Sequence, residues 1–192
     1  MVDIASLIEE HQYTISTVGF LIPIIEKVGQ EMISCLRHGG KILFMGNGGS
    51  AADAQHLAAE LIGRFQHERE AYAALALTTD TSVLTAIGND YGYKNIFSRQ
   101  IQGLCKPEDV VVGISTSGNS PNIIAALHIA KSIGAVTVGL SGKDGGELRN
   151  TADYCLTIPH QVTARIQEAH IFIGHVLCDW VEQGLMKEDE DV

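Results

Sequence analysis

Four hydroxyl side chains gather in one short segment, Ser115-Thr116-Ser117-Gly118-Asn119-Ser120. The segment follows an apolar, mostly β-branched run at 110–114 that predicts a buried strand, and Pro121 suits the first position of a helix. A hydroxyl-rich loop between a strand and a helix start can bind a phosphate group without any Lys or Arg. The alternative is that the hydroxyls only cap the helix, but one hydroxyl suffices for a cap, so their number favours phosphate.

A second loop is glycine-rich and runs from Gly46 to Gly49, directly after an apolar run at 42–45. Glycines let the backbone turn sharply and let a ligand approach closely. Ser50 is predicted to cap the following helix, with Asp53 in its first turn, so that free N–H groups face an anion or a sugar hydroxyl. The glycine spacing excludes a dinucleotide fingerprint, and the missing lysine excludes a P-loop. An ordinary tight turn is the alternative.

Ionisable side chains recur on two predicted helices. His56 and Glu60 are spaced to share one face of the helix after the glycine loop, where the alternative is an ordinary surface pair. The last predicted helix, 162–186, is apolar but carries Arg165, Gln167, Glu168, His170 and His175. Polar groups in such a helix are costly unless they are paired. Spacing alone would pair Gln167 with His170, and the alternative for either histidine is a satisfied core or interface residue.

The elements that must position these residues alternate along the chain. Five short apolar runs are predicted strands, at 42–45, 73–77, 110–114, 135–140 and 154–158. Most are followed by a loop rich in Gly, Ser, Thr, Asn or Asp and then by a helical pattern, which indicates a doubly wound parallel α/β sheet. Ligands bind such sheets beyond the carboxyl ends of the strands, where both loops lie.

Between the second and third predicted strands, Gly88-Asn89-Asp90-Tyr91-Gly92 is predicted to break a short helix that ends near Ile87. Asn and Asp after a helix usually serve the turn itself. A substrate contact by Asn89 and Asp90 is the alternative.

Residues 3–37 have a helical apolar pattern, with Pro23 starting a second helix or kinking the first. This arm must bury its apolar stripe against a partner subunit or back on its own sheet. We therefore expect one domain over 1–192, composed of an N-terminal helical arm at 1–40 and an α/β sandwich at 41–192.

The composition is that of a globular protein, with 45% hydrophobic and 19% charged residues. The net charge of −10 argues against a nucleic-acid surface, which needs a basic stripe. The four cysteines are scattered and form no C-x-x-C, which predicts a reduced cytoplasmic protein without thiolate metal ligands. No segment resembles a signal peptide or has transmembrane length, so no membrane association is expected.

Six motifs occur in order along nearly the whole chain. They are Gly46-Asn47-Gly48-Gly49-Ser50, His56-x-x-x-Glu60, Gly88-Asn89-Asp90, Ser115-Thr116-Ser117-Gly118-Asn119-Ser120, Gly142-Lys143-Asp144-Gly145-Gly146 and Arg165-Ile166-Gln167-Glu168. Their order and spacing resemble those of the phosphoheptose isomerase family, whose members are sedoheptulose 7-phosphate isomerases of the sugar-isomerase (SIS) fold. The hydroxyl loop alone is shared by many SIS proteins, and its combination with His56, Glu60, Gln167 and His175 is far more specific.

The resemblance implies a five-stranded SIS-type sheet and the conversion of sedoheptulose 7-phosphate to D-glycero-D-manno-heptose 7-phosphate, for bacterial lipopolysaccharide cores and other surface glycans. It implies a cytoplasmic homotetramer that binds Zn2+, with active sites at subunit interfaces and a phosphorylated seven-carbon sugar as substrate. The implied zinc ligands are His56, Glu60, Gln167 and His175. The implied substrate contacts are Asn47, Gly48, Gly49, Glu60, Asn89, Asp90, Ser115, Thr116, Ser117, Ser120 and Gln167.

These residue types suit the implied chemistry. A ketose–aldose interconversion moves a proton between adjacent carbons through an enediol, and a carboxylate is a natural shuttle, so Glu60 is the expected base. His175 is the expected acid/base at the substrate oxygens, and zinc would polarise the carbonyl. Gln is an unusual zinc ligand. Glu60 would have to rearrange to act both as a tight ligand and as a free base.

Two alternatives share the same fold. The SIS adaptor that binds the bacterial replication initiator is similar too, and Ala51, Gln55 and His56 fit it, but that resemblance fails at Glu60 and His175. The other alternative is an isomerase for a different phosphosugar, because the sequence does not set the sugar chain length.

Overall fold

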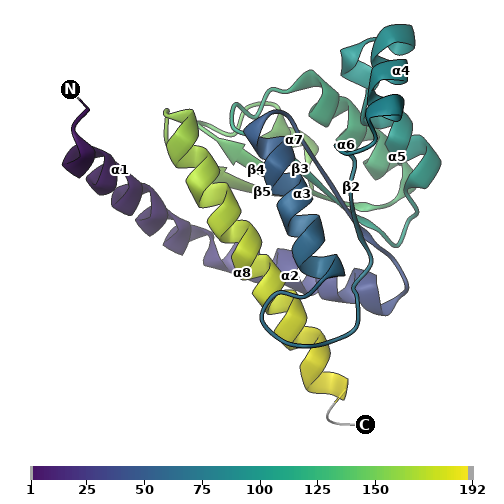
Figure 1. Cartoon of the computed structure of the whole chain (residues 1–192), viewed down its shortest axis with the longest axis horizontal. Coiled ribbons are helices and arrows are strands. Elements are labelled where there is room, and N and C mark those ends of the chain that lie inside the picture. The colour runs from purple at the N-terminus through teal and green to yellow at the C-terminus, as the bar shows by residue number, and fades with distance from the viewer. Residues whose placement is uncertain (1, 190–192) are drawn as a thin grey trace.

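A five-stranded parallel sheet forms the centre of the molecule (Figure 1). The computed structural model describes residues 2–189, so residue 1 and residues 190–192 of the predicted domain lie outside the described range. The strand order is β2-β1-β3-β4-β5. The strands are β1 (Ile42–Gly46), β2 (Ala74–Ala76), β3 (Val110–Ser115), β4 (Val136–Gly142) and β5 (Tyr154–Ile158). All five predicted strands and the parallel α/β sheet are therefore confirmed.

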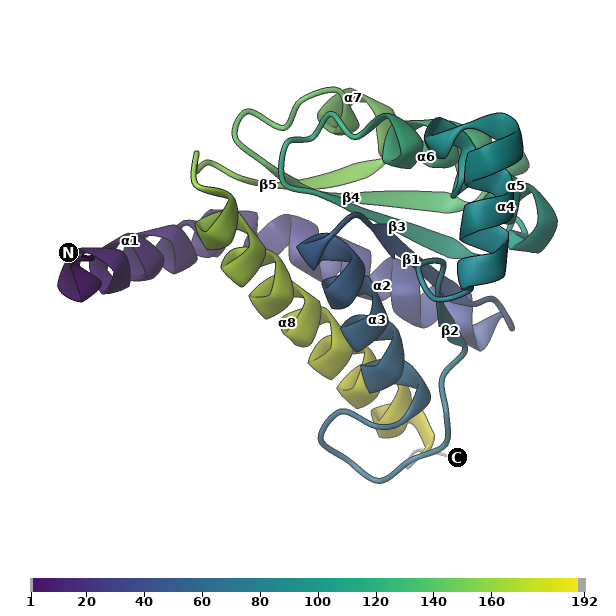
Figure 2. The same ribbon diagram turned by 45° about the horizontal axis from the view of Figure 1, so that its top comes forward.

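Helices cover both faces of the sheet, because the central strands are apolar on both sides (Figure 2). In β1, Ile42 and Phe44 face one core, whereas Leu43 and Met45 face the other. The helices over the first core are α2 (Ile22–Arg37), α3 (Gly49–Ile62) and α8 (Thr163–Asp189); those over the second are α4 (Thr81–Tyr91), α5 (Ser98–Leu104), α6 (Pro121–Ile133) and α7 (Leu148–Thr151). None of the helices among residues 2–189 combines the length and the apolar character needed to cross a bilayer.

The strand order brings the glycine loop and the hydroxyl loop to neighbouring strand ends. The chain leaves β1 for the edge strand β2 and then returns to β3 on the other side of β1, so the direction of winding reverses between β1 and β3. Gly46, the last residue of β1, is in register with Ile114 of β3, one residue before Ser115. Because ligands bind open α/β sheets at such a reversal, this edge is the expected binding edge.

The N-terminal region consists of two helices joined by a short 3₁₀ segment, Val18–Leu21. The first, α1 (Ile4–Thr17), projects away from the sheet and contacts α8, whereas α2 packs on the sheet (Figure 1). Pro23 lies in the first turn of α2, where its missing N–H costs no hydrogen bond. The helical N-terminal region is thus present, and its division from the rest of the domain near residue 40 stays a prediction.

The region around Gly88 differs from the prediction. α4 continues through Gly88, Asn89 and Asp90 and ends only at Gly92, which has a φ of +81°. One internal glycine costs a helix only about 1 kcal/mol, whereas the positive φ of Gly92, which glycine adopts without strain, takes the chain out of the helix. The predicted break at Gly88 was therefore wrong, and Asn89 and Asp90 belong to the last turn of a helix.

Candidate active site

The loop after β1 turns through glycines that another residue could replace only with backbone strain, at Gly48, or with a clash, at Gly46. Gly48 has a φ of +56° and a ψ of −120°. A Cβ at Gly46 would lie 2.3 Å from the backbone oxygen of Ser50. α3 begins at Gly49 with Gly48 as its N-cap, so the prediction that Ser50 caps this helix was wrong. Ser50 is buried inside the first turn, and no side chain caps the helix start that faces the binding edge.

Asn47 ties this loop to the start of α6. Its Nδ2 donates to Asn122 Oδ1 (3.0 Å), and Asn122 Nδ2 donates in return to Asn47 Oδ1 (2.8 Å). The Tyr93 hydroxyl also donates to Asn47 Oδ1 (2.8 Å). Asn122 is buried and lies two residues after Ser120, so this reciprocal pair fixes the glycine loop relative to the hydroxyl loop.

The hydroxyls of the loop after β3 converge instead of capping α6. Ser115 Oγ lies 2.8 Å from Ser120 Oγ and 3.4 Å from Ser117 Oγ. Ser120 is the N-cap residue of α6, yet its side chain makes no capping hydrogen bond. The alternative that these hydroxyls serve only as caps therefore fails for Ser120. The hydroxyls, with half-buried Thr116, lie beside a helix start, where an anion is favoured.

The loop after β4 shapes the hydroxyl loop. Gly118 has a φ of +68°, and a Cβ there would lie 2.1 Å from the backbone oxygen of Gly145. Asn119 Nδ2 donates to the backbone oxygen of Ser117 (3.0 Å), and Asn119 Oδ1 accepts from the backbone N–H of Glu147 (2.9 Å). The glycine-rich motif at 142–146 thus packs against the hydroxyl loop and helps to fix its conformation.

A cleft of about 410 Å³ opens between the glycine loop and α4. It is lined by Gly46, Asn47, Gly48, Ala51, Thr78, Leu84, Thr85, Gly88, Tyr93, Ile96 and Phe97. Asn89 and Asp90 are exposed just beyond Gly88, and Asn89 Nδ2 donates to Asp90 Oδ1 (2.8 Å). The structure therefore places Asn47 and Gly48 in the cleft and places Asn89 and Asp90 next to its lining.

A separate cluster of ionisable groups joins α3 to α8. His56 Nε2 lies 2.9 Å from His175 Nε2 and 3.2 Å from Glu60 Oε1. One ligand atom from each of the three residues lies within 4.8 Å of the others. The side chain of His56 is 48% exposed and that of Glu60 is 24% exposed, so solvent reaches the cluster. Two imidazole nitrogens and one carboxylate oxygen are ligands that zinc prefers.

Phe65 and Asp53 flank this cluster. The Phe65 ring stacks on the His175 ring, with centroids 5.7 Å apart and planes 28° apart. Asp53 lies one helical turn before His56, and its Oδ2 is buried without a hydrogen-bond partner in the described part of the chain. Burial raises the pKa of the Asp53 carboxyl, and His56 opposes the rise. An orphaned acceptor of this kind is satisfied by water, an ion or a ligand.

Gln167 and His170 lie apart from the cluster, although they share α8 with His175. Gln167 precedes His175 by about 12 Å along the helix axis. Its Nε2 fills the space next to Gly49, only 2.4 Å from where a Cβ would be. His170 is fully buried, and its Nε2 donates to the backbone oxygen of Ser141 (2.9 Å). Burial lowers the pKa of His170 to about 4, so this histidine is a neutral core residue.

The sequence did not predict three contacts at these sites. Tyr93 and Asn122 contact Asn47, and Phe65 contacts His175. Each depends on elements that meet only in the folded chain. Asn122 had one local signal, because it follows Pro121 at a helix start beside the hydroxyl loop.

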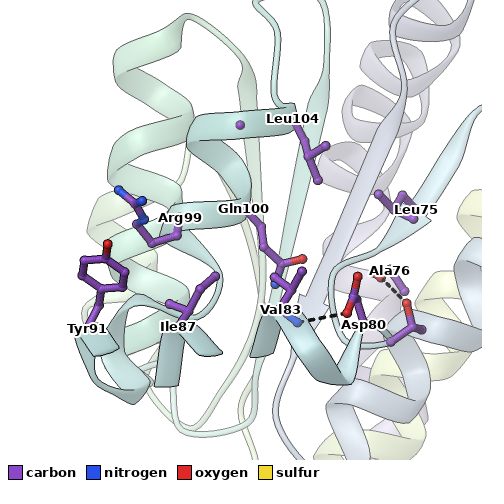
Figure 3. A pocket seen from close by; sticks show the side chains of 11 residues that line it. Leu75, Ala76, Asp80, Val83, Ile87, Tyr91, Arg99, Gln100 and Leu104 are labelled. Carbon is purple, nitrogen blue, oxygen red and sulfur yellow. Dashed lines mark hydrogen bonds between the residues drawn. The ribbon is translucent and has the colours of Figure 1, made fainter. Parts of the chain in front are cut away.

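A larger cavity, of about 580 Å³, lies at the sheet edge among β2, α4 and α5 (Figure 3). Its polar groups are occupied by structural contacts. Asp80 accepts from the backbone N–H of Val83 (3.0 Å), Gln100 donates to two backbone oxygens (3.0 and 2.8 Å), and Arg99 lies over the Tyr91 ring (4.6 Å). None of the predicted site residues lines this cavity, so it is not the candidate active site.

Known proteins match this chain over most of its length. Residues 21–142 match the SIS domain family. A phosphoheptose isomerase of Geotalea daltonii is 54% identical over 187 residues, which cover 97% of this chain and 97% of that protein. One from Paramagnetospirillum magneticum is 55% identical over 176 residues, covering 91% and 92%. The solved phosphoheptose isomerase from Neisseria gonorrhoeae has a TM-score of 0.89 at 44% identity, and the match covers 94% of this chain and 97% of that one.

Proposed function

Since this chain belongs to the phosphoheptose isomerase family, a family of SIS-domain phosphosugar isomerases, we propose that it converts sedoheptulose 7-phosphate to D-glycero-D-manno-heptose 7-phosphate through an enediol. The observation that carries the proposal is the meeting of His56 and Glu60 with His175, which lies 119 residues after His56. A replication-initiator adaptor needs no such cluster, and the relatives described above give that alternative no support.

The substrate phosphate binds the hydroxyls of Ser115, Thr116, Ser117 and Ser120. Three of these hydroxyls converge beside the start of α6, and hydroxyl and amide donors hold a phosphate without a basic side chain. The sugar hydroxyls then contact the glycine loop at Asn47, Gly48 and Gly49. The remaining substrate contacts in this proposal are Asn89, Asp90, Gln167 and Glu60.

Glu60 moves the proton between the two substrate carbons. Its Oε1 faces His56 at 3.2 Å, so we assign the proton transfer to Oε2. The Nε2 of His175 faces His56, so we assign to its other ring nitrogen, Nδ1, the exchange of protons with the substrate oxygens, which stabilises the enediol and opens the sugar ring. Phe65 covers one face of the His175 ring and limits its rotation.

His56, Glu60 and His175 would hold Zn2+, because their donor atoms face one another and fit its preferred ligands. The Nε2 atoms of the two histidines lie 2.9 Å apart, close enough for both to reach one ion. When bound, the ion would polarise the substrate carbonyl. Gln167 is the fourth proposed ligand, but within one chain it lies about two helical turns from His175.

The active site is completed between subunits of a homotetramer. Glu60 lies eleven residues after Gly49 in α3, about 16 Å along the helix axis. Within one chain, the proposed proton shuttle is therefore far from the glycine loop. Apolar side chains of the N-terminal region are exposed in the single chain, among them Ile4, Ile8 and Phe20. Burying them against another copy would stabilise the assembly and bring a second copy's cluster towards the loops.

The reaction takes place in the cytoplasm, where it supplies heptose for lipopolysaccharide and other surface glycans. The four cysteines are all free thiols, which is compatible with a reducing compartment.

An isomerase assay with seven-carbon and six-carbon ketose phosphates tests this function. We expect turnover of sedoheptulose 7-phosphate and much slower turnover of the six-carbon ketose phosphate. Preference for the six-carbon sugar would support the alternative phosphosugar isomerase, and no turnover of either would contradict the enzymatic function.

A further inference from the structure

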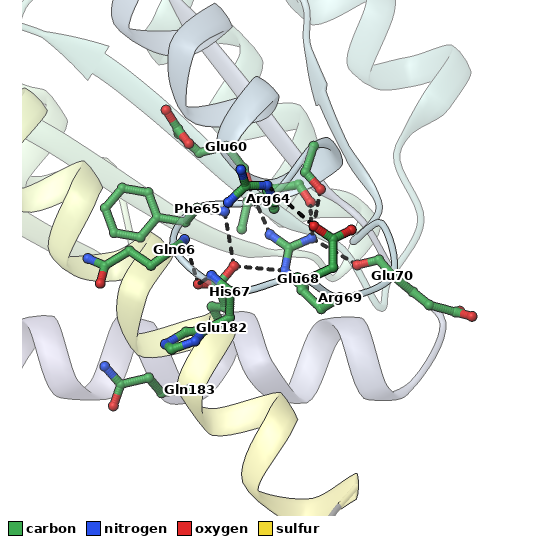
Figure 4. Close-up of polar contacts among 12 residues, drawn as sticks. Glu60, Arg64, Phe65, Gln66, His67, Glu68, Arg69, Glu70, Glu182 and Gln183 are labelled. Atoms are coloured by element: carbon green, nitrogen blue, oxygen red, sulfur yellow. Dashed lines mark hydrogen bonds and ion pairs between the residues drawn. The ribbon is translucent and has the colours of Figure 1, made fainter.

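A buried ion pair closes the loop that follows α3, residues 63–72, against α8 (Figure 4). The Glu182 side chain is 0% exposed and that of Arg69 is 5% exposed. Glu182 Oε1 accepts from the backbone N–H of Phe65 (2.9 Å) and from Arg69 Nε (3.0 Å). Glu182 Oε2 accepts from the backbone N–H groups of Gln66 (2.8 Å) and His67 (2.9 Å). One carboxylate therefore fixes three consecutive residues of the loop.

Arg69 uses its remaining N–H groups to hold the end of α3. Its Nη2 donates to the backbone oxygen of Glu60 (2.9 Å). Its Nη1 donates to the backbone oxygens of Leu61 (2.9 Å) and Glu70 (2.8 Å). Carbonyls in the last turn of a helix have no partners within the helix, so this guanidinium takes the place of a C-terminal cap.

The ion pair is connected at two points to the His56–Glu60–His175 cluster. Phe65, whose N–H is held by Glu182, stacks on the His175 ring. Glu60, whose backbone oxygen is held by Arg69, supplies the carboxylate of the cluster. Glu182 also lies two helical turns after His175, on the same side of α8. The loop thus links both helices that contribute to the cluster.

We infer that Glu182 and Arg69 are positioning residues for this cluster, acting through Phe65 on the His175 ring and through the last turn of α3 on Glu60. The inference rests on the function proposed above. Fixing the ring plane of His175 and the backbone of Glu60 keeps their ligand atoms facing His56. Such supporting contacts typically change metal affinity or activity by about 10- to 100-fold.

The charge state of Glu182 is compatible with this role. Burial alone would raise the pKa of its carboxyl, but the backbone N–H groups of Gln66, Phe65 and His67, together with Arg69, outweigh burial and lower it. Glu182 is therefore an anion at neutral pH, with four donors around it.

Phe65→Leu is the first test, because it removes the stacked ring and keeps the buried ion pair. We expect Zn2+ affinity, measured by competition with a chromophoric chelator, to fall about tenfold. We also expect kcat for sedoheptulose 7-phosphate to fall with little change in KM. Phe65→Tyr, which keeps the ring, should restore both values. Glu68→Gln is the matched control on the same loop, since Glu68 is 91% exposed and pairs across the surface with Arg64 (3.5 Å).

Glu182→Gln tests the ion pair itself. It keeps the shape, removes the charge and turns an N–H group towards backbone donors, so the loss of Zn2+ affinity should exceed that of Phe65→Leu. A folded Phe65→Leu protein with affinity and kcat within twofold of the wild type would overturn the inference, even if Glu182→Gln fails to fold. A wild type that binds zinc but does not turn over the sugar would contradict only the proposed function. A wild type that neither binds zinc nor turns over the sugar would overturn both.

Discussion

His170 offers a test of the distinction between the two histidines of α8. It is fully buried, its Nε2 donates to Ser141, and its Nδ1 has no hydrogen-bond partner in the described structure. A proton added to Nδ1 would be buried without an acceptor, so burial lowers the pKa of His170 from 6.5 to about 4. The unfolded chain accepts that proton near pH 6.5, and the folded chain does not.

The sign and size of the effect follow from this difference. Between pH 6.5 and 4 the unfolded state binds more protons, so the free energy of unfolding decreases as the pH falls through this range. Above pH 6.5 the contribution of His170 is constant. At about 1.4 kcal/mol per pKa unit, the full loss is about 3 kcal/mol.

Urea unfolding isolates this contribution when the wild type and His170→Gln are compared. Both proteins are measured at the same fixed concentration and at several pH values from 7.5 to 4. Glutamine keeps a donor for the Ser141 oxygen but cannot titrate. We expect the wild type to lose about 3 kcal/mol more than His170→Gln over the range, while the variant keeps most of its activity at pH 7.5. Parallel pH dependences of the two proteins would refute the reasoning, and so would a loss of activity as large as that of His175→Gln.

Three further predictions concern the proposed site. The double variant Ser117→Ala/Ser120→Ala should raise KM for the phosphorylated sugar because it removes two phosphate donors; an unchanged KM in the folded protein would exclude this phosphate site. Chelation of bound metal should lower kcat, and added Zn2+ should restore it; full activity in metal-free protein, verified by elemental analysis, would exclude a catalytic ion. Light scattering at micromolar concentration should give the mass of a tetramer, since exposed apolar residues such as Phe20 need covering; a monomer mass would contradict an active site shared between subunits.

The sheet could be predicted from the sequence because its strands are short apolar runs that end in Gly-, Ser- or Asn-rich loops. Residues 154–158 form β5 with the predicted bounds. β1 is one residue longer than the predicted strand at 42–45, because it includes Gly46. The strand order could not be derived from these patterns. That order, which puts β3 next to β1, brings Asn47 to Asn122 and makes the two loops neighbours.

Local signals failed where several glycines or hydroxyls competed for one role. Gly88 was a plausible helix stop, but Gly92 stops α4 because it adopts a positive φ. Ser50 was a plausible N-cap, but Gly48, two residues earlier, is the N-cap of α3, and Ser50 is buried in the first turn of the helix.

Helix spacing alone did not distinguish His170 from His175. The two are five residues apart, which is about 140° around a helix, so they face different neighbours. His170 points to the Ser141 oxygen in the core, whereas His175 faces His56 of α3. Only the family resemblance favoured His175, and the packing of α8 on α3 supplies the physical reason.

The central claim is that Glu60 transfers the proton in a phosphosugar isomerisation, and turnover of sedoheptulose 7-phosphate by Glu60→Gln tests it most directly. Glutamine keeps the shape and a weak ligand oxygen but cannot accept the proton. We predict a decrease in kcat of at least about 100-fold, with folding and oligomeric state unchanged. Near-normal turnover by this variant would contradict the account.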